Sequence, residues 1–209
     1  MARPREFDEA AVLDAAIERF WQRGYEATSV RDLAEEMNIA GASLYNAFGD
    51  KRSLYARALN RYLDQTFRER IRRIEPASSP REAISAFLQE IIKRSLTDKQ
   101  RRGCMLVNSA IESAPFDPDF LGIVATFLDE VEAFFFRCVS KGQKDRSITR
   151  DHSAEDLSKS LLGVLLGIRV LARVRPDRKL LEGLLRPILG LLDGEATAPS
   201  RGMRKTRSH

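Results

Sequence analysis

The segment 27–54 constrains the fold more than any other part of the chain, because it reads as two short helices separated by a tight turn. Thr28 and Ser29 carry hydroxyl groups suited to capping a helix start. Apolar residues then recur at three- and four-residue spacing, which predicts one buried face on a short helix: Val30, Leu33, Ala34 and Met37. Residues 38–40 interrupt the pattern, and 42–48 form a second short helix. This arrangement is a helix-turn-helix unit.

Helical hairpins also occur in proteins that never contact DNA, so the residue pattern has to decide. Thr-Ser-Val-Arg-Asp-Leu-Ala at 28–34 is followed by Ser43-Leu44-Tyr45, Phe48 and Lys51. Further matching positions lie upstream, at Ala11–Ile17, Phe20 and Gly24-Tyr25. Over roughly the first 55 residues this pattern closely resembles the DNA-binding signature of the tetracycline-repressor (TetR) family. The remaining length and helical pattern resemble the family more loosely.

The predicted fold is all-α, with about nine helices and no convincing strand. A three-helix, helix-turn-helix DNA-binding domain is expected over 1–52, with a flexible arm at 1–6. A larger helical domain for effector binding and dimerisation is expected over 53–195. The tail at 196–209 is rich in proline, serine, glycine and basic residues, so we expect it to be disordered.

The family resemblance implies how the second helix would engage DNA. Tyr45 would give its hydroxyl to one backbone phosphate and Lys51 would hold a second one; such contacts position a protein on DNA. Arg3 and Arg5 could enter the minor groove, although solvated charge explains them as well. The full set of predicted DNA contacts is Arg3, Arg5, Thr28, Ser29, Arg31, Ala42, Ser43, Tyr45, Asn46 and Lys51.

One segment departs from the family pattern. Ala40-Gly41-Ala42 stands where many relatives have a capping serine or asparagine, a basic residue or proline, and then glycine or proline. The second helix is therefore predicted to lack a side-chain cap, a loss of about 1 kcal/mol. It also lacks one cation that would face DNA.

The family resemblance also implies a small effector in the second domain, which we expect to be apolar. Asn108 and Glu112 could orient it, although capping or rim hydrogen bonds explain these residues equally well. Aromatic residues at helical spacing could line a pocket but are also typical of a plain core. The predicted effector contacts are Phe87, Cys104, Met105, Asn108, Glu112, Phe116, Phe120, Phe127 and Phe134.

Cys104 stands at a helix start beside Arg101 and Arg102, and both features lower a thiol pKa. A thiol-redox-sensing regulator acting through Cys104 is thus an alternative, and an inert buried cysteine is another. The two cysteines, Cys104 and Cys138, have no metal-ligand or CxxC spacing, so no metal or other cofactor is predicted.

The last two predicted helices, over 153–173 and 177–192, are apolar on more than one face. A terminal helix of this kind favours a homodimer built as a four-helix bundle. Gly163 and Gly167 would allow close helix approach. The predicted interface is Leu157, Leu161, Leu165, Ile168, Leu181, Leu184, Leu185, Ile188 and Leu192.

The net charge of the chain by itself neither indicates nor excludes DNA binding. The formal net charge is +5, but residues 1–75 hold 13 basic and 13 acidic residues. Most of the excess lies in the last nine residues. We expect a cytoplasmic protein, because the longest apolar run is too short to span a bilayer and the N-terminus has no apolar signal segment.

The leading hypothesis is a sequence-specific, DNA-binding transcriptional regulator, a homodimeric repressor released by a ligand from a pseudo-palindromic operator. An enzyme is not expected, because the chain has two histidines and no nucleophile elbow, phosphate-binding loop or zinc motif. A helical scaffold protein is the other alternative.

Overall fold

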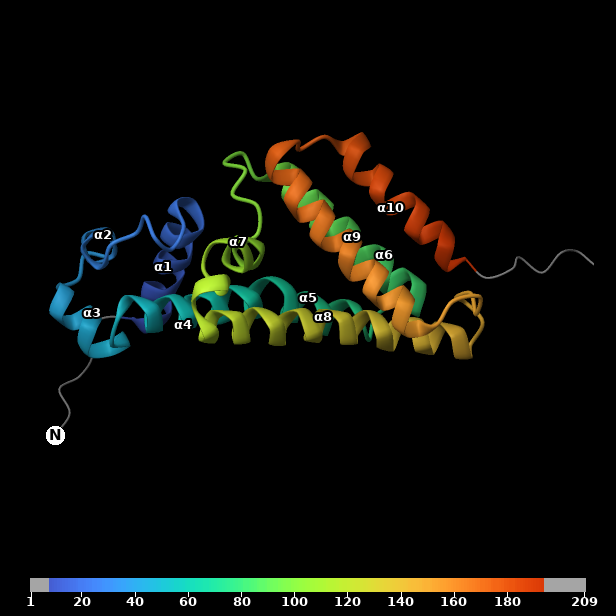
Figure 1. Ribbon diagram of the computed structural model, residues 1–209, viewed down its shortest axis with the longest axis horizontal. Coiled ribbons are helices and arrows are strands. Elements are labelled where there is room, and N and C mark those ends of the chain that lie inside the picture. Colours follow the sequence, from blue (N-terminus) through green and yellow to red (C-terminus); the bar gives the residue numbers. More distant parts are fainter. Residues whose placement is uncertain (1–7, 194–209) are drawn as a thin grey trace, which may run out of the picture.

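The computed structural model describes residues 8–193, and every regular element in that range is helical. Figure 1 shows an elongated molecule with α1, α2 and α3 at one end and α6, α9 and α10 at the other. The elements are α1 (Glu9–Arg23), α2 (Val30–Glu36), α3 (Gly41–Phe48), α4 (Lys51–Leu63), the π-helical turn η1 (Asp64–Arg68), α5 (Glu69–Ile74), α6 (Pro80–Thr97), α7 (Met105–Glu112), the 3₁₀ turn η2 (Ala114–Phe116), α8 (Pro118–Lys144), α9 (Ala154–Val174) and α10 (Arg178–Leu192).

α4, η1 and α5 follow one another without a break and form a single long helix over 51–74. When they are counted as one, the described residues hold nine α-helices, which confirms the all-α prediction. This long helix runs beside α8 (Figure 1), and Arg68 joins the two through a bidentate ion pair with Glu130 at 2.7 and 2.8 Å. The long helix therefore links the first three helices to the second domain.

Local sequence explains where the first helices begin and end. Asp8 caps α1, and Gly24, with φ of +81°, ends it in a conformation that side chains rarely adopt. Ser29 and Asp32 form a reciprocal capping box at the start of α2. Asp50 caps α4 by accepting from the amide of Ser53 at 2.7 Å. These short-range bonds fix where the first helices begin and end.

The core of the second domain is rich in aromatic side chains. The rings of Phe67 and Phe127 pack with centroids 5.0 Å apart, and those of Phe87 and Phe134 with centroids 5.1 Å apart. All four rings are buried. They fill the space between the long helix, α6 and α8, so burial of apolar surface stabilises the contact of all three.

The predicted dimer interface requires a correction. Its side chains are the inward face of α9 and α10, which packs within the protomer against α6 and α8. The helices are apolar on more than one face, and the sequence pattern did not show which face meets the chain's own core. Leu184 alone is partly exposed; the buried residues are Leu157, Leu161, Leu165, Ile168, Leu181, Leu185, Ile188 and Leu192.

No helix within residues 8–193 combines the length and the apolar character needed to cross a bilayer.

Candidate nucleic-acid interface

The second helix of the helix-turn-helix unit, α3, presents one face to solvent. Leu44 and Phe48 are buried against the core, whereas Ala42, Tyr45 and Asn46 are exposed. Tyr45 is the most prominent of these residues, with 52% of its surface accessible although it is a large aromatic residue. Ser43 is only half-buried. The residues that the family resemblance assigns to base reading, Ala42, Ser43 and Asn46, thus lie on the same side of α3 as Tyr45, the predicted phosphate contact.

Thr28 does not present its side chain to DNA, which corrects the prediction for this residue. It is buried, and its hydroxyl donates to the carbonyl of Gly24 at 2.8 Å. Ser29, one position later, is exposed and is the residue that caps α2. Two adjacent hydroxyl residues can both cap a helix, and the tight turn after α1 uses the first one.

Lys51 and Arg31 lie at the rim of this surface. The Lys51 ammonium lies 4.2 Å from the centre of the Tyr25 ring, a cation–π contact that orients it at the start of α4. Arg31 is highly exposed and pairs with Glu35 one turn along α2, at 2.8 Å. A hollow of about 580 Å³ lies between α2 and α3 and is lined by Arg31 and Tyr45, among others. Arg3 and Arg5 lie outside the described residues.

α3 begins without a side-chain cap, as its sequence predicts, because Ala40 occupies the N-cap position in an extended conformation. Ala40→Ser should therefore stabilise the helix-turn-helix unit by about 1 kcal/mol, since serine can accept from an orphan amide of the first turn. The urea midpoint of unfolding measures the gain, and Ala47→Ser, inside the same helix, is the matched control. An unchanged midpoint for Ala40→Ser would contradict the assignment of an uncapped start.

The start of α4 is tied to the start of α8. Arg52 holds Asp117 through two contacts of 2.5 and 2.8 Å and reaches Asp119 at 2.6 Å. The Arg52 hydrogen bonds lower the pKa of Asp117 to about 2, so its carboxylate is charged at neutral pH. Because Arg52 follows Lys51, these contacts connect the predicted phosphate-binding position to the second domain.

An aromatic cluster reinforces this junction. The rings of Tyr25 and Tyr55 each lie about 5 Å from the ring of Phe120, with centroid distances of 5.2 and 5.1 Å. The Tyr55 hydroxyl lies 2.6 Å from the Ser109 hydroxyl of α7, and burial raises the pKa of Tyr55 to about 12. Phe120, a predicted effector contact, therefore packs between the two domains.

The remaining predicted effector contacts fall into different places. Phe87, Phe127 and Phe134 belong to the aromatic core, and Cys104 and Met105 are buried at the start of α7. The predicted contact of these residues and Phe120 with an effector stays a prediction.

The polar and exposed members of that set have other surroundings. Asn108 donates to the carbonyl of Arg102 at 3.1 Å and accepts from Arg173 at 2.8 Å. Glu112 is exposed and lies beside Gly24. The Phe116 ring is 86% exposed on the surface, and its predicted contact with an effector stays a prediction. Pro115 lies in the short 3₁₀ turn that follows α7 and Pro118 begins α8, so the ring lies between two helices and outside the core.

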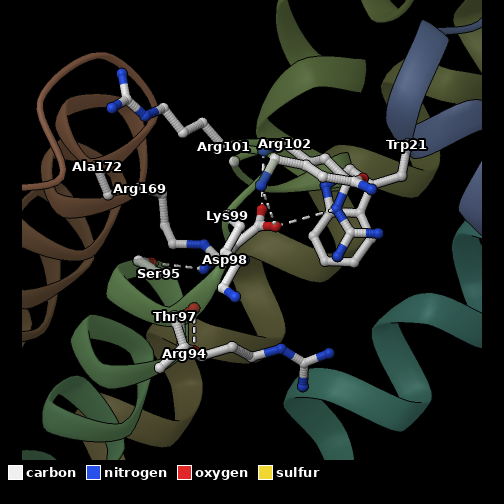
Figure 2. A pocket seen from close by; sticks show the side chains of 12 residues that line it. Trp21, Arg94, Ser95, Thr97, Asp98, Lys99, Arg101, Arg102, Arg169 and Ala172 are labelled. Carbon is white, nitrogen blue, oxygen red and sulfur yellow. Dashed lines mark hydrogen bonds and ion pairs between the residues drawn. The ribbon is translucent and has the colours of Figure 1, made fainter.

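A cavity of about 360 Å³ lies where the loop between α6 and α7 meets α1 and α9. Figure 2 shows Arg169 reaching from α9 toward Ser95, with Trp21 and Arg102 on the opposite side. Sequence reasoning missed this cavity. The available signal was Arg169 itself, the one charged residue in the otherwise apolar stretch 161–172.

Within residues 8–193 there is no group of three or more histidine, cysteine, aspartate or glutamate side chains placed to hold a metal ion.

An exposed second helix in a helix-turn-helix unit, joined through a long helix to an all-helical domain, defines a class of DNA-binding regulators. Comparison with known proteins agrees. Residues 12–58 match the family described as bacterial regulatory proteins, tetR family, and residues 80–188 match the tetracyclin repressor-like C-terminal domain.

Individual proteins give the same result. An uncharacterized HTH-type transcriptional regulator of Bacillus subtilis, YezE, is 31% identical over 194 residues, which are 92% of this chain and 100% of YezE. The Escherichia coli HTH-type transcriptional repressor ComR is 33% identical over 56% of each chain. A cysteine-substituted form of the TetR family regulator CifR, solved with a 26-base-pair operator DNA, is 34% identical with a TM-score of 0.79, and the match covers 90% of this chain and 98% of that one. The chain belongs to the TetR family of DNA-binding transcriptional regulators.

Proposed function

We propose that this regulator is a cytoplasmic, homodimeric repressor that a small molecule releases from a pseudo-palindromic operator. The observation that carries the proposal is the exposed face of α3. It presents Tyr45 and Asn46, is followed by Lys51 at the start of α4, and belongs to a unit tied to the second domain through Arg52. The naming of ComR as a repressor and the operator complex of CifR support the same activity here.

The outward faces of α9 and α10 support a dimer. On α9, Gly163, Gly167, Val170 and Val174 follow one another at three- and four-residue spacing, and both valines are exposed. A Cβ added at either glycine would meet no atom within 4 Å. Leu191 is exposed on α10. A second copy of this face would bury these apolar surfaces and could approach closely at the glycines.

The junction between the domains supports coupling. Ligand binding in the second domain would shift α8 or the loop before α7, and both are bonded to the DNA-binding unit: Arg52 to Asp117, and Arg102 to Glu18. The distance between the two α3 helices of a dimer would change as a result. Since coupling between sites is reciprocal, bound DNA should weaken ligand binding by the factor that ligand weakens DNA binding.

Selection of bound duplexes from a random DNA pool tests the proposal. The expected product is a pseudo-palindrome whose half-sites are centred about one helical turn apart, because a two-fold dimer places its helices in successive major grooves. Enrichment of a single half-site would contradict the dimer, and failure to enrich any sequence would contradict sequence-specific binding.

A second candidate, a thiol-sensing regulator acting through Cys104, is favoured by one specific observation. Burial raises the cost of a charged thiolate, but the Arg169 guanidinium, the Val107 amide and the Tyr62 hydroxyl together outweigh it and hold the pKa of the Cys104 thiol below its usual range. The Tyr62 hydroxyl also lies 3.8 Å from its sulfur. Cys138 differs, since burial raises its pKa to about 12. Cys104 would thus be the thiol poised to react with an electrophile, its sulfur forming the new bond as a thiolate.

The ultraviolet absorbance of the thiolate, followed against pH in a Cys138→Ser background, measures this directly. Absorbance should appear at a lower pH than for an ordinary thiol and shift upward in Arg169→Gln. Because the pKa is lower folded than unfolded, the thiolate adds stability above the unfolded pKa and that stability is lost as the pH falls through the folded pKa. An ordinary titration in both proteins would contradict the poised thiol.

A further inference from the structure

The cavity between α1, α9 and the α6–α7 loop contains a buried cation with no carboxylate partner in the described part of the chain. Only 5% of the surface of Arg169 is accessible. Its guanidinium donates to Ser95 at 3.0 Å and to Tyr62 at 3.3 Å, both uncharged hydroxyls, and lies beside the Cys104 thiol. Among residues 8–193 no carboxylate lies within ion-pairing distance of it. A buried arginine usually has an acidic partner, since desolvation of a lone charge is costly.

Two buried donors on the lining of this cavity also have no partner. They are Nε of Arg169 and the indole Nε1 of Trp21. Native proteins leave few buried hydrogen-bond donors unsatisfied, so two of them on one cavity indicate a missing partner. Both groups can only donate, so the missing partner is an acceptor.

The charge of the lining points the same way. It includes four further cations, Arg94, Lys99, Arg101 and Arg102, and one acid, Asp98, which bonds to Arg102 at 3.3 Å. An ionised Cys104 next to Arg169 would supply one negative charge, and the cavity would still be positive. A cavity lined by several cations attracts an anion.

We propose that this cavity binds a small organic carboxylate, with Arg169 as its principal partner, and that this carboxylate is the effector. A volume of about 360 Å³ is at the small end of ligand pockets and larger than an inorganic ion needs. The planar guanidinium fork matches the two oxygens of a carboxylate. The Trp21 ring and Ala172 supply apolar surface for the remainder of the ligand. This inference rests on the proposed ligand-released repressor.

Arg102 gives the cavity a route to the DNA-binding unit. Its guanidinium lies 4.0 Å from the centre of the Trp21 ring in α1 and forms an ion pair with Glu18 of the same helix. A carboxylate bound beside Arg102 competes with Glu18 for this cation. Binding thus loosens a contact that holds α1, on which α2 and α4 pack.

Trp21 is the only tryptophan of the chain, so its fluorescence reports on the cavity without a label. The full-length, DNA-free protein is titrated with benzoate, hexanoate and succinate at constant ionic strength, with benzamide as the uncharged counterpart of benzoate and inorganic phosphate as a second anion. The expected result is a saturable change with at least one carboxylate and none with benzamide.

Arg169→Gln should weaken that carboxylate about tenfold or more, as expected for loss of a charge-assisted bond. The exposed double variant Lys99→Gln, Arg101→Gln should weaken it several-fold without disturbing the core. Arg186→Gln, in the separate groove between α6 and α10, is the matched control and should leave affinity unchanged.

Three results would overturn the carboxylate site: no saturable response to any carboxylate, equal binding of benzamide, or unchanged affinity in both cavity variants. Binding of phosphate alone would overturn the carboxylate class. The bound carboxylate should also lower operator affinity, and unchanged operator affinity would overturn its assignment as effector. If the protein bound no operator at all, the proposed repressor function would be rejected. The fluorescence titration would still test whether the cavity binds a carboxylate.

Discussion

Replacing Tyr45 with alanine is expected to weaken operator binding about a hundredfold while leaving the fold and the oligomeric state unchanged. Tyr45 is 52% exposed on the outward face of α3, so its removal costs little core packing. A hydrogen bond to a charged phosphate contributes about 1.5 kcal/mol or more. A dimer makes the contact twice, and about 3 kcal/mol corresponds to roughly a hundredfold in affinity.

Fluorescence anisotropy of a labelled operator measures this loss. Tyr45→Phe separates the hydroxyl from the ring and should lose most of the same affinity if the phosphate contact dominates. Lys159→Gln, an exposed position on α9, is the control for surface mutation.

Lys51→Gln should reduce the salt dependence of binding, because fewer counterions are released. In a helical scaffold protein, neither Tyr45→Ala nor Lys51→Gln would change DNA binding. Equal DNA binding by wild type and Tyr45→Ala would therefore support the scaffold alternative.

Val170→Glu is expected to convert the proposed dimer to a monomer and to lower affinity for a two-half-site operator by more than a hundredfold. Val170 is 43% exposed on the outward face of α9, in the row formed with Gly163, Gly167 and Val174. In a two-fold interface the substitution would bury two like charges, each at a cost of several kcal/mol. Each monomer would then have to bind its half-site independently, so the gain in affinity from joining two helix-turn-helix units in one dimer would be lost. Sedimentation velocity measures the oligomeric state.

Leu121→Glu is the matched control for the interface. Leu121 is 55% exposed on α8, so the substitution adds the same charge at a similar apolar surface position. It should leave the dimer intact. If Val170→Glu remained dimeric, or if Leu121→Glu dissociated instead, the subunits would have to meet at a surface other than the outward face of α9.

Much of the fold could be predicted from the sequence, because the signals are local. Capping residues such as Ser29 and Asp50 mark helix starts, and the three- and four-residue spacing of apolar residues marks the buried faces. The absence of a cap at Ala40 was equally readable. On α3, the spacing of Leu44 and Phe48 leaves Tyr45 and Asn46 on the opposite face, so the exposed surface followed from the periodicity of the helix.

The errors arose where a pattern leaves two faces equivalent. α9 and α10 are apolar on more than one side, and only the packed structure shows that Leu161 and Leu165 face the protomer's own core while Val170 faces outward. Thr28 and Ser29 could both cap a helix, and the turn after α1 decides between them. The Arg169 cavity joins residues 21, 94–103 and 169–172. Such a meeting of distant segments leaves no local signal beyond one isolated charge.

The measurement that tests the central claim most directly is an anisotropy titration of the wild-type protein with DNA from immediately upstream of its own gene. It should be made at two salt concentrations, with unrelated competitor DNA present. We expect tight, salt-sensitive binding that survives the competitor and saturates with two protomers per pseudo-palindromic site. The opposite result, binding that competitor removes and that Tyr45→Ala leaves unchanged, would mean that α3 does not recognise this DNA and would contradict sequence-specific binding through α3.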